Sequence, residues 1–106
     1  METTIQEKDG MLYAIFNGRL DTSSASQVEK DVKPLSDSTD HDIVLDCTDM
    51  TYISSSGLRI FLGVLKNSKS KGLRVFIKGL TPDVEKIFKM TGFINLFEAF
   101  EKKEEE

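Results

Sequence analysis

Three consecutive serines and a glycine, Ser54 to Gly57, stand where an apolar segment gives way to a helical pattern. The apolar residues Ile43–Leu45 before them are predicted to form a buried strand. A helix N-terminus has unpaired backbone N–H groups and the positive end of the helix dipole, so it attracts an anion such as a phosphate. A serine here can cap the helix, bind an anion, or carry a phosphate that the helix end stabilises. These residues alone leave all three roles open.

Residue patterns of common catalytic sites are missing from this chain. It contains no Gly-x-x-x-x-Gly-Lys, no Gly-x-Gly-x-x-Gly and no Gly-x-Ser-x-Gly. A single histidine, His41, and a single cysteine, Cys47, exclude the common zinc sites. Asp21, Asp46 and Asp49 could form a carboxylate cluster like that of a receiver domain, but the acidic pair and the lysine that a receiver needs are not in the required order. We therefore expect no catalytic residue, no metal and no cofactor.

Composition limits the class of protein. The chain has 106 residues, of which 39% are apolar, and a net charge of −4. This length suits one domain with an ordinary core, and the negative charge argues against nucleic-acid binding. No apolar run approaches the length of a membrane span, and no signal-peptide pattern precedes the first strand. A lone cysteine cannot form an internal disulfide, and together these features predict a cytoplasmic protein without membrane contact.

The first half of the chain is predicted to contain a hairpin and a helix. Thr3–Glu7 and Leu12–Asn17 are strand-like, and Asp9-Gly10 between them is typical of a tight β-turn. A helix is expected to follow and to end or kink at Pro34. Its candidate N-caps are Thr22, Ser23 and Ser24.

The second half alternates between strands and helices. Ile43–Leu45 and Val75–Ile77 are continuous apolar runs, which suit strands that are covered on both faces or central in a parallel sheet. Helices are predicted from about residue 56 to 70 and from Thr81-Pro82 to Gly92. We therefore predict an α/β fold: an opening β-hairpin, then β-α repeats, giving a mixed, mostly parallel sheet flanked by helices. Residues 1–100 would form one domain, and residues 101–106 a charged C-terminal tail.

Three motifs carry a resemblance to a known family. Tyr52 to Arg59, Tyr-Ile-Ser-Ser-Ser-Gly-Leu-Arg, follows an Asp-terminated apolar strand and resembles the signature loop of bacterial anti-sigma factor antagonists, which are stand-alone STAS domains. Phe16–Asp21 resembles the family's Gly-x-Leu-Asp turn. Lys89–Phe93, followed by Leu96-Phe97, resembles its Thr-Gly-Leu…Leu-Phe ending. The resemblance extends from about Thr3 to Phe100 and implies the STAS architecture.

The resemblance also implies a function. In this family the unphosphorylated antagonist binds an anti-sigma factor that is also a serine kinase, and so frees the sigma factor. Phosphorylation of a loop serine ends the binding, and a phosphatase restores it. Ser55 aligns with the acceptor serine, and Ser54 stands where many relatives have Asp, so Ser54 and Ser56 remain alternative acceptors.

A docking surface is expected around the serine loop. Leu58, Phe61, Leu62 and Leu65 share one helical face, the predicted core stripe, whereas Ile60 points elsewhere. Ile60 is either a single exposed apolar residue or part of the docking surface. Asp21 is expected near the loop because parallel strands end at the same sheet edge, although it could simply cap a helix. The predicted partner-binding residues are Asp21, Met50, Tyr52, Ser54, Ser55, Ser56, Gly57 and Ile60.

Two alternative functions remain open at this stage. One is a STAS module that binds a partner or small ligand without a phosphorylation cycle. The other is a nucleotide-binding or hydrolysing domain that holds phosphate at the helix N-terminus. The absence of a phosphate-binding lysine and of further loop glycines counts against the second alternative.

Overall fold

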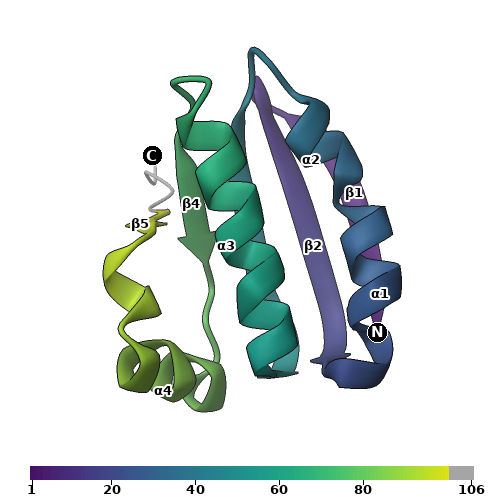
Figure 1. Ribbon diagram of the computed structural model, residues 1–106, viewed down its shortest axis with the longest axis vertical. Helices are drawn as coiled ribbons and strands as arrows, with labels where there is room; N and C mark the ends of the chain where they lie inside the picture. The colour runs from purple at the N-terminus through teal and green to yellow at the C-terminus, as the bar shows by residue number, and fades with distance from the viewer. Residues whose placement is uncertain (101–106) are drawn as a thin grey trace.

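Five strands form one sheet and lie in it in the order of the sequence (Figure 1). The structure is a computed structural model that describes residues 1–100, so the predicted tail at 101–106 lies outside the described residues. The elements are β1 (Glu2–Lys8), β2 (Met11–Leu20), α1 (Thr22–Asp31), α2 (Lys33–Asp37), β3 (Asp42–Ile53), α3 (Ser55–Lys69), β4 (Val75–Lys78), α4 (Pro82–Thr91), the 3₁₀ helix η1 (Phe93–Asn95) and β5 (Glu98–Ala99). β1 is antiparallel to β2, and all other neighbouring pairs are parallel. The predicted mixed, mostly parallel α/β fold is confirmed.

The turns form where the sequence predicts them. Asp9 and Gly10 have φ values of 56° and 78°, the left-handed pair that a two-residue β-hairpin turn requires. α1 ends at Asp31, and α2 begins with Pro34 in its first turn, so the predicted break occurs there. Gly92 ends α4 in the left-handed conformation, with φ of 79°.

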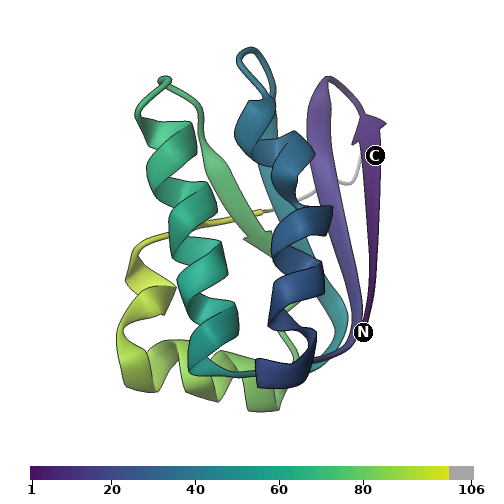
Figure 2. The same ribbon diagram turned by 45° about the vertical axis from the view of Figure 1, so that its right-hand side comes forward.

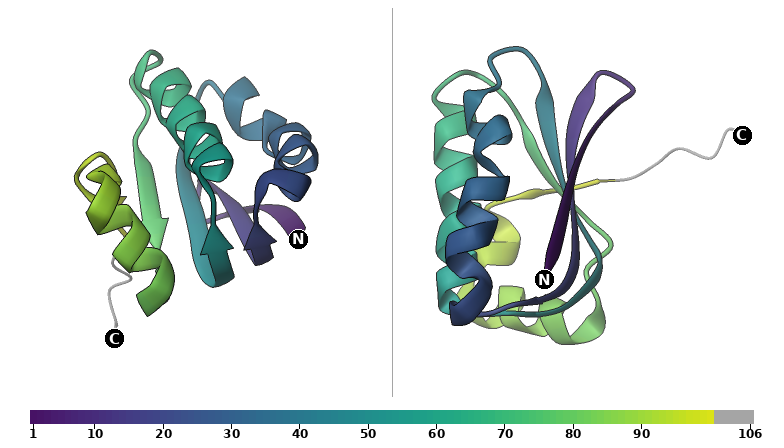
Figure 3. Two further views of the ribbon diagram at one scale, coloured as in Figure 1. Left: turned by 60° about the horizontal axis from the view of Figure 1, so that its bottom comes forward. Right: turned by 90° about the vertical axis from the view of Figure 1, so that its right-hand side faces the viewer.

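One face of the sheet packs against α1 and α3 (Figure 3, right). Aromatic rings from β2, α3, α4 and the segment before β5 meet in this core. The Phe61 ring of α3 lies 5.2 Å from that of Phe16, 6.2 Å from that of Phe88 and 6.4 Å from that of Phe97. The fully buried rings of Phe16, Phe61 and Phe88 therefore join β2, α3 and α4 into one hydrophobic core.

Side chains rather than helices cover the other face. Tyr13, Val44 and Phe76 are register neighbours on β2, β3 and β4. The ring of Phe100 meets both Tyr13 and Phe76 edge-on, at centroid distances of 5.9 Å. Burial raises the pKa of Tyr13, whose side chain is only 6% exposed. The central strands β2, β3 and β4 thus carry apolar side chains on both sides of the sheet, although helices cover only one side.

Three local predictions are corrected. β3 continues to Ile53, well beyond the predicted strand Ile43–Leu45, because it pairs with β2 up to Leu20. In α3, Val64 is buried although it lies outside the predicted core stripe, because α3 also contacts α1 and α2 beside the sheet. Leu62, which was predicted to lie in that stripe, is only partly buried. The N-cap of α1 is Asp21 rather than Thr22, Ser23 or Ser24, and capping is one of the two roles expected for Asp21.

Candidate functional site at the carboxyl edge of the sheet

The serine loop lies where β2 and β3 end side by side (Figure 3, left). The backbone N–H of Ser54 donates a hydrogen bond of 2.8 Å to the carbonyl of Leu20, the last residue of β2. Asp21 follows Leu20 directly, so the predicted proximity of Asp21 to the loop is confirmed. Both α1 and α3 begin at this edge of the sheet.

Ser54 is the N-cap of α3. Its hydroxyl oxygen accepts a hydrogen bond of 3.2 Å from the backbone N–H of Gly57, and its carbonyl accepts one of 2.9 Å from Leu58. The side chain is half-buried. Its oxygen thus already satisfies one of the free donors of the helix end.

Ser55 is the first residue of α3 and is exposed. Within residues 1–100, its hydroxyl makes no hydrogen bond, and the backbone N–H groups of Ser55 and Ser56 have no acceptor. These two donors and the positive end of the helix dipole can receive the oxygens of an anion. Ser55 is therefore the most exposed of the three loop serines, and its unengaged hydroxyl lies beside this anion-binding end.

Gly57 is buried, so its prediction as a partner-contacting residue is wrong. A Cβ atom on this glycine would lie 2.8 Å from Cγ1 of Ile53 and 2.8 Å from Cδ2 of Leu20. The absence of a side chain lets the first turn of α3 pack closely on the ends of β2 and β3. Gly57 thus sets the position of the serine loop by its close packing.

Met50 is also misassigned by the sequence prediction. It is fully buried in the hydrophobic core, because β3 continues as a strand and this residue faces inward. Thr81, the N-cap of α4, donates a hydrogen bond of 3.2 Å from its hydroxyl to the Met50 carbonyl. Met50 therefore anchors α4 and is not part of the docking surface.

Tyr52 is half-exposed, and the guanidinium of Arg19 lies over its ring. The guanidinium carbon of Arg19 lies 4.5 Å from the ring centroid, a cation–π distance. Arg19 Nε also lies 3.7 Å from Oδ2 of Asp21. Arg19 was not among the predicted site residues, although it occupies the variable position of the Gly-x-Leu-Asp turn.

Asp21 was expected either to lie near the serine loop or to cap a helix, and it does both. Its Oδ1 accepts hydrogen bonds from the Ser23 hydroxyl at 2.8 Å and from the backbone N–H of Ser24 at 3.1 Å, and the Ser24 hydroxyl accepts one from the Asp21 N–H. This is a reciprocal capping box at the start of α1. The hydrogen bond from Ser23, followed by those from Ser24, lowers the pKa of Asp21. Asp21 is thus a cap that lies next to the serine loop.

A groove of about 210 Å³ runs between α1 and α3, which lie side by side in Figure 2. Ile60 is half-buried in it and packs partly on the core. The lining residues are Ala25, Ser26, Glu29, Ser56, Arg59 and Ile60. Because Ser56 directly follows Ser55, the groove continues the surface of the serine loop. We call the combined surface of Arg19, Asp21, Tyr52, Ser54–Ser56 and this groove the switch surface.

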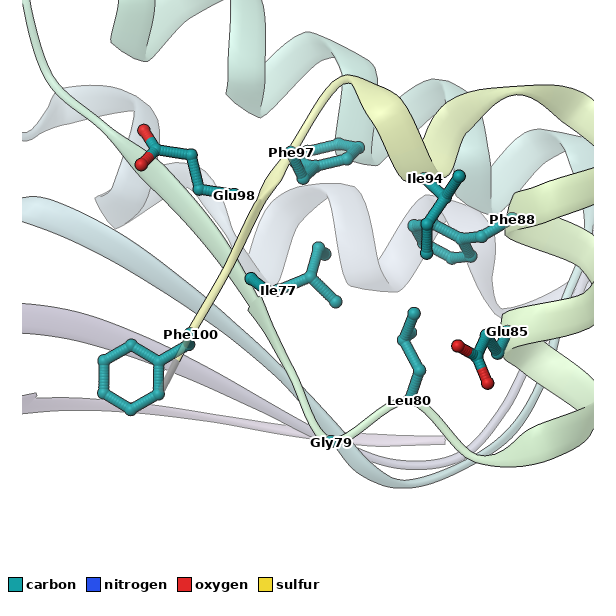
Figure 4. Close-up of a pocket in the computed structure, with 10 residues that line it drawn as sticks. Ile77, Gly79, Leu80, Glu85, Phe88, Ile94, Phe97, Glu98 and Phe100 are labelled. Carbon is teal, nitrogen blue, oxygen red and sulfur yellow. The ribbon is translucent and has the colours of Figure 1, made fainter. Parts of the chain in front are cut away.

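A second cavity, of about 280 Å³, lies between β4, α4 and η1 (Figure 4). Its lining includes the apolar side chains Ile77, Leu80, Phe88, Ile94 and Phe97. The two carboxylates that line it are already paired, Glu85 with Lys89 at 3.6 Å and Glu98 with Arg74. Among residues 1–100, this cavity therefore offers no free charged group to a ligand.

Asp46 and Cys47 have structural surroundings. Asp46 Oδ1 accepts hydrogen bonds from the backbone N–H and the hydroxyl of Thr48, at 3.0 and 2.7 Å, and Oδ2 lies 3.7 Å from Lys78 Nζ. Cys47 is fully buried, and burial raises the pKa of its thiol, which stays protonated. Within residues 1–100 there is no cluster of three His, Cys, Asp or Glu side chains suited to a metal ion. In the same part of the chain, no helix combines the length and apolarity needed to cross a membrane.

Comparison with known proteins gives consistent results. The sequence profile of the STAS domain matches residues 2–106. BtrV of Bordetella bronchiseptica, named as a candidate anti-sigma factor antagonist, is 32% identical over 98% of this chain and 90% of its own. The anti-sigma-B factor antagonist of Staphylococcus aureus is 28% identical over 100% of this chain and 96% of its own.

Solved structures of SpoIIAA, an anti-sigma factor antagonist, have the same fold. The unphosphorylated form superposes with a TM-score of 0.78 at 16% identity, covering 95% of this chain and 90% of that one. The phosphorylated form of the Bacillus protein superposes with a TM-score of 0.71 at 14% identity, covering 95% and 93%. The fold described here is thus that of SpoIIAA in both states.

Proposed function

This chain belongs to the STAS domain family, and on that basis we propose that it is an anti-sigma factor antagonist whose partner binding is switched by phosphorylation of Ser55. The partner is an anti-sigma factor that is also a serine kinase. Unphosphorylated chain binds this partner through the switch surface and so frees a sigma factor. The protein serves as a binding module and as a kinase substrate, with no catalytic residue of its own.

The environment of Ser55 is the observation that supports this function most directly. The hydroxyl of Ser54 is engaged as a helix cap, and Ser56 lies in the wall of the groove. Ser55 is exposed at the first position of α3, beside two backbone donors that have no acceptor within residues 1–100. A kinase can reach its hydroxyl, and the helix end can hold the product.

The covalent step converts a neutral hydroxyl into an anion. The kinase transfers the γ-phosphoryl group of ATP to Oγ of Ser55, ADP leaves, and the hydroxyl proton passes to a base of the kinase. The new group adds about −1.5 to −2 charges at neutral pH. The N-terminus of α3 stabilises this charge, so the domain stays folded. A partner that covers Ser55 would have to remove water from this dianion, which is costly, and therefore it dissociates. A phosphatase restores the hydroxyl by hydrolysing the phosphoester.

Mapping the phosphorylation site tests the proposal. The chain is incubated with the anti-sigma factor kinase of its source organism and ATP, and the modified residue is identified by mass spectrometry. We expect one phosphate, on Ser55, and none on the Ser55→Ala variant. Ser54→Ala and Ser56→Ala serve as matched controls that keep Ser55. Modification mainly at Ser54, Ser56 or Ser23 would contradict the assignment.

A further inference from the structure

Arg59 occupies a position from which it can reach both the serine loop and the groove. It lies four positions after Ser55 on α3, and both residues are exposed. Side chains at this spacing are neighbours on a helix surface, with Cβ atoms about 5–6 Å apart. Arg59 also lines the groove together with Ser56 and Ile60. It is therefore the groove cation placed next to the proposed phosphorylation site.

The groove contains one cation and one anion. Arg59 belongs to α3 and Glu29 to α1, and both are exposed. Neither forms an ion pair with another residue of the described chain, 1–100. In the unmodified protein the charges of the groove balance, and each remains available to an external group.

We propose that Arg59 carries the effect of Ser55 phosphorylation to the groove by exchanging one anionic ligand for another. This inference rests on the proposed function and specifies how its switch operates. In the unmodified chain the Arg59 guanidinium binds a carboxylate of the partner's docking segment, which also places an apolar side chain against Ile60. After modification the guanidinium binds the phosphate on Ser55 instead. Arginine suits both roles because its planar donors match carboxylate and phosphate alike.

The exchange makes the groove repel the segment that it previously bound. The phosphate adds about −1.5 to −2 charges and engages Arg59, the only cation that lines the groove among residues 1–100. Glu29 then faces no free cation across the groove. An acidic docking segment meets negative charge from both walls, and such like-charge contacts exclude a partner. Loss of binding thus follows from two effects, the dianion on Ser55 and the removal of Arg59.

The first experiment needs no partner. Phosphoserine is placed at position 55, and the second pKa of the phosphate, about 6 in an unperturbed group, is measured by phosphorus NMR in the parent and in Arg59→Gln. A neighbouring guanidinium favours the dianion, so we expect a higher phosphate pKa in Arg59→Gln than in the parent. Lys66→Gln removes the same charge at the far end of α3 and should leave the parent value unchanged. Equal values for the parent and Arg59→Gln would overturn the proposal.

The second experiment measures the dissociation constant of the purified anti-sigma factor kinase for each variant, with and without phosphate on Ser55. Arg59→Gln should weaken binding of the unmodified chain about tenfold, and phosphorylation should weaken its binding by a smaller factor than in the parent. Lys66→Gln should match the parent, and thermal melting confirms that all variants are folded. If the parent chain binds the kinase with the same dissociation constant with and without phosphate on Ser55, both the proposed function and this inference would be overturned. Phosphorylation-sensitive binding that is identical in Arg59→Gln and the parent would overturn the inference alone.

Discussion

Three adjacent serines have three different environments in this structure. Ser54 caps the N-terminus of α3, Ser55 has an exposed hydroxyl without a hydrogen bond in residues 1–100, and Ser56 lines the groove between α1 and α3. A shift of one position along the chain thus changes a structural hydroxyl into an accessible one. This difference allows the role of Ser55 to be separated experimentally from the role of its neighbours.

Replacing Ser55 with aspartate should weaken partner binding by about tenfold or more without unfolding the chain. A negative charge in the first helical turn stabilises the helix by about 0.3–1 kcal/mol, whereas the same charge opposes burial in an interface. Calorimetric titration with the anti-sigma factor gives the binding constant, and thermal melting gives the stability.

Ser54→Asp is the matched control for this prediction. It introduces the same charge one residue earlier, at the N-cap, where aspartate is as good a cap as serine. We expect parent-like melting and binding much closer to that of the parent than Ser55→Asp shows. Equal losses of binding in both variants would mean that total charge, rather than the position of Ser55, controls the interface.

The elements around the site depend on how closely α3 can approach the sheet. Gly57→Ala should destabilise the fold by about 1–3 kcal/mol, as overpacking of a core does, because the new methyl group would lie 2.8 Å from side-chain carbons of Ile53 and Leu20. Gly63→Ala, in the same helix, has no heavy atom within 4 Å of its new Cβ. It should stabilise the fold by up to about 1 kcal/mol, the difference in helix propensity. Chemical denaturation of the two variants measures both effects, and equal values would contradict the packing argument.

The success of prediction from the sequence depended on how local each signal was. The Asp9-Gly10 turn, the break at Pro34 and the helix end at Gly92 follow from the conformations available to those residues. The length of β3 and the burial of Met50 depend on pairing with β2 and on α4, which are distant in sequence. Such contacts leave no periodic pattern in the segment itself.

The same distinction applies to the site residues. The serines could be identified because capping and anion binding are properties of a helix start. Arg19 and Arg59 were missed because their importance depends on neighbours that only the fold brings near, the Tyr52 ring and the groove wall. The i, i+4 spacing of Ser55 and Arg59 was the one signal in the sequence that could have indicated Arg59.

At the scale of the whole molecule, the switch surface and the only histidine lie at opposite edges of the sheet. His41 precedes the start of β3, whereas Ser54 follows its end. Nδ1 of His41 lies 2.7 Å from Oδ1 of Asp40, and Nε2 lies 3.1 Å from Oε2 of Glu7 on β1. The contact with Glu7, followed by that with Asp40, raises the pKa of His41. The protonated imidazole thus joins β1 to the connection before β3.

This arrangement predicts a stability that depends on pH. Because folding raises the pKa of His41, its contribution is fully present below the unfolded value of about 6.5 and is lost as pH rises through the folded value. The melting temperature of the parent should therefore exceed that of His41→Gln at about pH 5.5, and the gap should narrow at a second, alkaline pH above the raised pKa. Partner binding by His41→Gln should match the parent at both values. A gap that is constant with pH would mean that protonation of His41 does not stabilise the fold.

This chain contains two tyrosines and no tryptophan, so the fluorescence of its tyrosines can report on the proposed switch surface. Tyr13 is 6% exposed and packs against Phe100, so a quencher dissolved in the solvent reaches it poorly. Tyr52 is half-exposed beneath Arg19, beside the serine loop. Emission that acrylamide can quench therefore comes mainly from Tyr52. Since a partner docked on the serine loop would shield this ring, complex formation with a tryptophan-free partner domain can be followed through the native chromophore, without attaching a dye to the surface under study.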